Sequence, residues 1–228
     1  LPIFFGGIPF GGEATQGMER FPYNTLNAEN PGISGFGDLY QNINQMNLFI
    51  SRTLHTDVLT ESARNYYLGQ VYGLRAYYMY QLYRSWGDVV FTEEPSLGFE
   101  VGKLAKAATP AAEIFEQVKK DIESSLSYFG SDYTIKEKKS LWSKAATLML
   151  KADVYLWSAH RDGGEGDART AKNALVDIQN NISRSNLDLM DTYQGVFAYD
   201  NKGNKEIIFT IHNELFEYNL WNGNNDLF

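Results

Sequence analysis

Aromatic and polar side chains gather in the first 36 residues of the chain, where Arg20, Phe21, Tyr23 and Phe36 occur. Repeated Gly and Pro in this stretch exclude a long helix or strand. Irregular segments of this length inside a compact domain are uncommon and often functional. Saccharides are held by aromatic rings and by a few fixed polar groups that bind their hydroxyls. The stretch is therefore a candidate binding site; alternatively, its aromatic residues dock on the rest of the fold.

A second aromatic and polar group, Tyr218, Trp221 and Asn222, lies near the end of the chain. The same stacking and hydrogen-bonding chemistry makes it a second candidate binding site. The alternative is a segment that packs on a further part of the protein. The chain starts at Leu1 without Met and ends in a polar stretch, so we expect both ends to be cuts.

The residue patterns of the common enzyme classes do not occur in this sequence. His55, His160 and His212 lie far apart without a metal-binding spacing, and there is no Cys. The nucleophile elbow and the phosphate-binding glycine motif are both absent. The adjacent acids Glu93 and Glu94 could serve a glycoside hydrolase, which needs two carboxyl groups, but 28 acids in the chain make such pairs expected. We therefore expect no catalytic residue, no metal and no cofactor.

Charge, apolar content and length limit the classes of partner and the number of domains that the chain can have. The formal charge of -8 and the pI near 4.9 disfavour nucleic acid, whose binding depends on clustered Lys and Arg. Apolar residues make up 43% of the chain, but no uninterrupted apolar run is long enough for a membrane-spanning helix. A length of 228 residues is compatible with one large domain or two small ones, and we favour one domain.

Helical periodicity begins at Phe36 and recurs along most of the chain. Apolar residues three or four apart predict a first helix from residue 36, with its Asn and Gln side chains on the opposite, polar side. A longer helix follows over Glu61 to Trp86, with Gly87 as its C-terminal cap and a short extended piece at Asp88 and Val89. Both helices are expected to face neighbouring helices.

Capping residues predict three further helices. Thr109 and Pro110 start one that runs to Gly130, Ser140 caps the next, which ends at Gly163 and Gly164, and Asp167 starts a shorter one. The β-branched and aromatic residues around 206–211 predict a short β segment.

An internal repeat connects two of these helices. Leu74-Arg75-Ala76 aligns with Leu150-Lys151-Ala152, and in both a small Ala allows close approach of a partner helix. We expect Arg75 and Lys151 to cover the core with their stems and to pair with acids across helices. The sequence predicts a mainly all-α fold of tetratricopeptide-like antiparallel helix pairs in an α–α superhelix, with long irregular loops. We expect a single domain over 1–228, with an irregular region at 1–36, helical repeats at 37–183, and loop with the short strand at 184–228.

Five segments, in this order, resemble those of the SusD/RagB family of outer-membrane nutrient-binding lipoproteins. They are FGDLYQNINQMNLFISR, SARNYYLGQVYGLRAYYMYQLYRSWGDVVFTEEPS, ATPAAEIFEQVKKDIESSLSYF, WSKAATLMLKADVYLWSA and NKEIIFTIHNE. The resemblance covers roughly residues 36 to 215 and concerns the N-terminal, helical-repeat portion of the family. The family's variable second half and its lipid-anchoring Cys do not occur in these residues.

The resemblance implies a surface-exposed lipoprotein of the outer membrane that captures glycans, or peptides in some branches. It also implies a SusC-like TonB-dependent transporter as partner, and membrane contact only through a lipid anchor that this chain lacks. The segment from Gly11 to Phe36 is similar to one that contributes to the ligand site in family members, which adds Asn24 to the candidates. Trp86 resembles a structural aromatic position of the family.

Two other functions remain open on the sequence. A helical-toroid glycoside hydrolase would use a pair of acids, and a cytoplasmic tetratricopeptide-type scaffold would bind peptides on the same helix pairs. The Thr-Pro start at residue 109 and the Glu-Ile-Ile-Phe stretch at residue 206 distinguish the chain from such a scaffold. Capture of a nutrient without chemical change is the function we expect.

Overall fold

The computed structural model describes residues 27, 29, 35–98, 105–136 and 139–211. Contacts divide the chain into two units, Leu1–Asp38 with Asn213–Phe228 and Leu39–His212. Nearly all residues of the first unit lie outside the described ranges. The fold described below is therefore that of the second unit.

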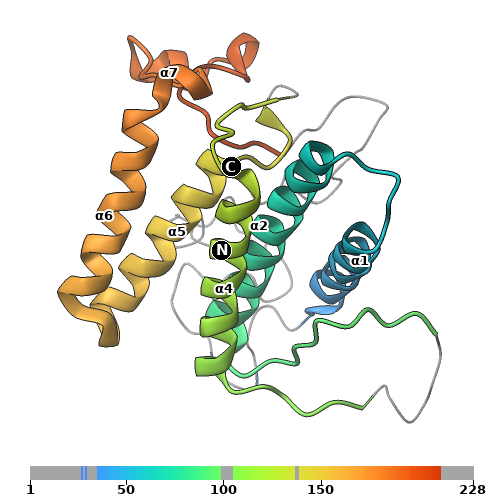
Figure 1. The fold of residues 1–228 in the computed structure, drawn as a ribbon. Coiled ribbons are helices and arrows are strands. Elements are labelled where there is room, and N and C mark those ends of the chain that lie inside the picture. Colours follow the sequence, from blue (N-terminus) through green and yellow to red (C-terminus); the bar gives the residue numbers. More distant parts are fainter. Residues whose placement is uncertain (1–26, 28, 30–34, 99–104, 137–138, 212–228) are drawn as a thin grey trace, which may run out of the picture. The chain divides into compact units, whose positions relative to one another are not determined.

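Five longer helices make up the second unit, and consecutive helices run antiparallel in Figure 1. They are α1 (Gly37–Leu54), α2 (Glu61–Trp86), α4 (Ala111–Phe129), α5 (Lys144–Ser158) and α6 (Gly164–Asn180). The helix pairs with the most extensive contact are α2 with α4 and α5 with α6. The mainly all-α fold of antiparallel helix pairs expected from the sequence is confirmed.

Short helical turns complete the unit. They are a π-helical turn η4 (Ala159–Gly163), α7 (Ile182–Ser185), α8 (Tyr193–Val196) and the 3-10 turn η5 (Tyr199–Asn201). No strand forms in the described part of the chain, so the prediction of a β segment near 206–211 is wrong. The Thr210 N–H donates to the Lys139 carbonyl over 3.0 Å, but within the described residues this bond is not continued as a ladder. Strand propensity depends on pairing and burial, and alone it does not produce a strand.

Helix α2 has the bounds that the sequence predicts. The Thr60 hydroxyl accepts the Ala63 N–H at its start, and Gly87, at φ 74°, donates its N–H to the Tyr83 carbonyl at its end. That positive φ is a backbone conformation that favours glycine. The predicted C-terminal cap at Gly87 is thus confirmed, and Thr60 caps the start of the helix.

Two other predicted helix starts are displaced by three residues. Ser143, not Ser140, caps α5, because its hydroxyl accepts the Ala146 N–H while residues 140–142 form a turn that buries Trp142. Helix α6 begins at Gly164, so Asp167 lies inside its first turn. Acidic residues are favoured both at the cap and in the first turn, and the sequence does not separate the two positions.

The predicted start of α4 at Thr109 and Pro110 is right to within one residue, since the helix begins at Ala111. The capping group comes from elsewhere in the chain, because the Asp88 carboxylate accepts the Ala111 N–H over 2.8 Å. Val89 and Thr109 form one antiparallel bridge, which matches the predicted extended piece after α2. The end of α2 and the start of α4 are thereby joined.

Small and polar residues form a buried contact between α2, α4 and α5. The Ser125 hydroxyl on α4 lies 2.6 Å from the Gly69 carbonyl and 2.8 Å from the Thr147 hydroxyl. Trp142 donates its indole N–H to the same Thr147 oxygen. A Cβ on Gly73 would lie 2.1 Å from the Trp142 ring nitrogen, so only glycine permits this approach. Ala76 and Ala152, the small residues of the internal repeat, are both buried as predicted.

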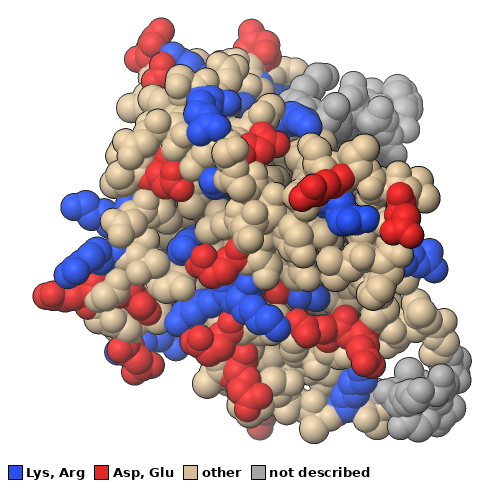
Figure 2. Space-filling model, viewed as in Figure 1, with Lys and Arg blue, Asp and Glu red and all other residues tan. Residues whose placement is uncertain are grey.

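Charges of both signs are mixed on the face of the molecule that Figure 2 shows. No single-sign basic surface of the kind that nucleic acids require is seen on that face. Within the described ranges, no helix combines the length and the apolar character needed to cross a membrane.

Candidate functional site

A buried ion pair lies between α2 and α4. The Arg75 guanidinium donates from Nε and Nη2 to the two carboxylate oxygens of Asp121, both over 2.7 Å. The two side chains are 2% and 1% exposed. Gln117, one turn earlier on α4, donates to the same carboxylate over 2.9 Å. This bidentate geometry is the strongest form of the ion pair that the sequence predicts for Arg75.

Asn47 extends this buried network to α1. Its side-chain oxygen accepts Arg75 Nη1 over 2.8 Å, and its amide nitrogen donates to the Thr92 carbonyl over 2.6 Å. The sequence places Asn47 on the polar side of the first helix, but it is 2% exposed. That expectation is wrong because a hydrogen-bonded partner on α2 permits a polar group at an inward position.

The segment Val89–Ser96 is held against α1 by polar side chains of that helix. Tyr40 donates its hydroxyl to the Val90 carbonyl over 2.9 Å. Asn44 binds both main-chain groups of Ser96, with 2.7 Å to its N–H and 3.2 Å to its carbonyl. Burial raises the pKa of Tyr40, so its hydroxyl keeps its proton and remains a donor. Three side chains of α1, about one turn apart, thus hold the segment through its main-chain groups.

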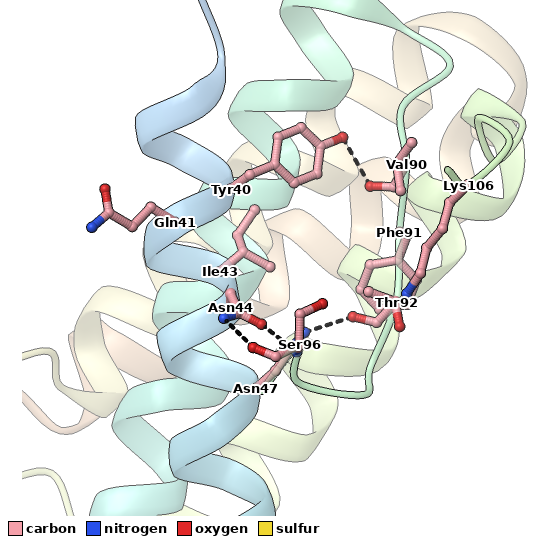
Figure 3. Close-up of a pocket in the computed structure, with 10 residues that line it drawn as sticks. All are labelled: Tyr40, Gln41, Ile43, Asn44, Asn47, Val90, Phe91, Thr92, Ser96 and Lys106. Atoms are coloured by element: carbon pink, nitrogen blue, oxygen red, sulfur yellow. Dashed lines mark hydrogen bonds between the residues drawn. The ribbon is translucent and has the colours of Figure 1, made fainter. Parts of the chain in front are cut away.

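A cleft of about 300 Å³ lies between α1 and this segment. Figure 3 shows Tyr40, Ile43, Asn44 and Asn47 of α1 on one side and the segment's Phe91 and Thr92 on the other. Gln41, Val90, Ser96 and Lys106 complete the described lining. Asn44, Asn47 and Tyr40 already bind main-chain groups. Gln41 points away from the segment in Figure 3, so the Lys106 ammonium is the polar group best placed to meet a solute. This cleft is the candidate site of the described residues.

The lining offers apolar surface and neutral polar groups with one cation. Such a cleft suits a polyhydroxylated or peptide-like solute held by hydrogen bonds. No group of three His, Cys, Asp or Glu side chains with metal-binding geometry occurs among the residues that the structure describes. Glu93, one of the two adjacent acids, is engaged with Lys120 and Gln117, each over 3.3 Å.

One of the sequence-predicted site residues, Phe36, lies within the described ranges. It directly precedes α1 and is 47% exposed. The others, Arg20, Phe21, Tyr23, Asn24, Tyr218, Trp221 and Asn222, lie outside the described residues. The front-end and C-terminal candidate sites therefore stay predictions.

The cleft residues on α1 and on Val89–Ser96 were not predicted from the sequence. The sequence signal nearest to them is the run of Asn and Gln on α1. The Leu-basic-Ala repeat, in contrast, predicts ion pairs that the structure contains. Lys151 pairs with Glu123 of α4 over 2.6 Å, just as Arg75 pairs with Asp121 of the same helix. Trp86 is partly buried against the main core, which confirms its structural role.

A family model described as "Starch-binding associating with outer membrane" matches residues 21–156, more than half of the chain. The chain belongs to this SusD-like family. The match includes α1, α2, α4 and the segment that forms the cleft.

Relatives and solved structures agree with this assignment. NanU of Bacteroides fragilis is 52% identical, with a TM-score of 0.84 over 95% of this chain and 42% of its own. A SusD superfamily protein of Bacteroides vulgatus is 47% identical, with a TM-score of 0.83 over 96% and 44%. SusD-like protein P25 of Formosa agariphila is 26% identical over 76% of this chain and 31% of its own length. The SusD-like chain thus spans less than half of these relatives.

Proposed function

We propose that this SusD-like chain captures oligosaccharide at the surface of the outer membrane and passes it to a SusC-like TonB-dependent transporter. In this proposal the protein is held at the membrane by a lipid anchor and does not transform its ligand. The front-end residues Arg20, Phe21, Tyr23, Asn24 and Phe36 supply aromatic and polar contacts, and Tyr218, Trp221 and Asn222 supply more.

The family match over residues 21–156 carries the proposal, because that family is described as starch-binding and associated with the outer membrane. The fold adds support of a more general kind. A laminarin-binding SusD-like protein and a structure solved with a xylogluco-oligosaccharide share it, both at 21% identity, with TM-scores of 0.71 and 0.69. Glycans differ among these proteins, so the choice of glycan depends on the loops and not on the helices.

The rigid helical frame suits capture. Binding without chemistry requires a preformed concave surface and no activated nucleophile or acid. Buried contacts such as the Arg75–Asp121 pair and the Ser125–Thr147 hydrogen bond fix the helices that carry the cleft.

Affinity electrophoresis tests glycan capture. Gels that contain soluble starch, laminarin or xyloglucan should retard the protein in at least one case, and no reducing ends should be released on incubation. The Tyr23→Ala variant should weaken the retardation, and Tyr199→Ala, whose ring is 85% exposed outside the candidate sites, should leave it unchanged. Steady release of reducing ends would instead favour a glycoside hydrolase.

A second experiment tests the transporter partner. The tagged full-length protein, extracted from its own outer membrane in mild detergent, should co-purify in a fixed ratio with a TonB-dependent transporter. Recovery of the protein in the cytoplasmic fraction, without the transporter, would favour the tetratricopeptide-type peptide scaffold.

A further inference from the structure

A second cleft, of about 420 Å³, lies between the start of α2 and the end of α4. It shares no lining residue with the cleft beside α1. Its lining comes from the first turns of α2, the last turn of α4 and the residues after α4. It includes Asn65, Tyr66, Tyr128 and Asp132. Its volume falls in the range of small-ligand sites, about 300 to 1,000 Å³.

The two clefts differ in how their polar groups are used. In the cleft beside α1, Asn44, Asn47 and Tyr40 are bound to main-chain groups of the protein. In the second cleft, the Asn65 amide and the Tyr128 hydroxyl make no hydrogen bond to any other described residue. Uncommitted donors and acceptors on well-ordered helices are available to a solute without breaking contacts of the fold.

The aromatic rings of this cleft are held in place by the fold. Tyr128 stacks on Tyr72 with ring centroids 5.6 Å apart and planes at 11°. Tyr66 packs edge-on against Phe129 at 6.4 Å, and the Lys136 ammonium lies 3.8 Å from the centre of its ring. Rings fixed in this way lose little conformational entropy when a ligand binds.

The charge of the lining selects the kind of solute. Glu61 and Asp132 of the lining are acids, while the nearby cations are engaged with other lining groups, Lys136 with the Tyr66 ring, Lys144 with the Gly130 carbonyl and Arg184 with the Ser131 carbonyl. The described lining therefore carries no excess of positive charge, which a site for phosphate, sulfate or uronate groups would need. Amide, hydroxyl and carboxylate groups between tyrosine rings are the combination that binds neutral sugars. From these observations we propose that the cleft between α2 and α4 is a second binding site for a neutral saccharide unit, separate from the site of the proposed function and sharing with it only the class of ligand.

Variants on the two helices test the site. In gels that contain soluble starch, laminarin or xyloglucan, Asn65→Ala and Tyr128→Ala should each weaken binding by about threefold to tenfold, the effect of one hydrogen bond. The matched control is Tyr67→Ala, which removes a 42% exposed tyrosine next to Tyr66 that does not line the cleft. It should bind like wild type, and thermal unfolding of all three variants shows whether they are folded.

Hydrogen exchange with maltotriose, laminaritriose or a xyloglucan heptasaccharide locates the contact directly. Protection of residues 61–66 and 127–132 that persists in Tyr23→Ala would support the second site. If Asn65→Ala and Tyr128→Ala bind like wild type and this protection is absent, while Tyr23→Ala abolishes binding, the second site is refuted and the proposed function stands. If the wild type shows neither retardation nor protection with any of these probes, both are refuted.

Discussion

Removal of the Asp121 carboxylate should be among the most damaging single changes in this fold. In Asp121→Ala, the Arg75 guanidinium would stay buried at 2% exposure without its two 2.7 Å bonds. Breaking a buried ion pair from one side costs about 3 to 5 kcal/mol, because an uncompensated charge remains in the interior. Arg75 keeps Asn47 at 2.8 Å and Glu93 at 3.7 Å, so we expect a loss near the lower end, about 3 kcal/mol.

Urea unfolding of the wild type and the variant, followed by circular dichroism, measures this loss. Asp188→Ala is the matched control, since it removes an exposed partner of Lys205 at 3.4 Å and should change the unfolding midpoint little. The double variant Arg75→Met/Asp121→Leu removes both charges and should recover most of the loss. A cost of Asp121→Ala no greater than that of the control, or no recovery in the double variant, would refute this account of the buried pair.

Three further changes have defined outcomes. Gly73→Ala should cost about 1 to 3 kcal/mol by thermal unfolding, because its Cβ would overlap the Trp142 ring, whereas Gly203→Ala, in open space, should be nearly neutral. Burial and the Asp177 hydrogen bond raise the pKa of Tyr133 to about 12. The stability that the protonated Tyr133 hydroxyl contributes is therefore complete below pH 10 and is lost as pH rises towards 12. Tyr133→Phe should lack that alkaline loss in urea unfolding at stepped pH. Asn44→Ala should speed amide exchange at Ser96 several-fold and leave the amides of α6 unchanged.

The helices could be predicted from the sequence because their signals are local. Periodic apolar residues and caps set the bounds of α2 to the residue and placed four other helices within a few residues of their observed limits. The errors occurred where two local signals coincide. Asp167 suits both a cap and a first turn, and the β-branched run near residue 206 suits a strand but is irregular in the described residues.

The cleft beside α1 could not be predicted because its contacts are long-range. Tyr40, Asn44 and Asn47 bind main-chain groups 45 to 52 residues further along the chain. The main-chain carbonyls and N–H groups that they bind are the same in every residue, so no side-chain pattern marks the segment that they hold. Helical periodicity alone assigned Asn47 to solvent, and only the position of Arg75 on the neighbouring helix explains its burial.

The Leu-basic-Ala repeat shows both the strength and the limit of such patterns. It predicts that Arg75 and Lys151 pair across helices, and both do so with acids two residues apart on α4, Asp121 and Glu123. The pattern does not show how much each of the two ion pairs stabilises the fold. Asn47 and Phe91, from α1 and the segment beside it, contact the Arg75 guanidinium, whereas Glu123 is 53% exposed. Glu123→Ala should therefore cost about 1 kcal/mol or less in urea unfolding, and a loss equal to that of Asp121→Ala would show that burial does not set the difference.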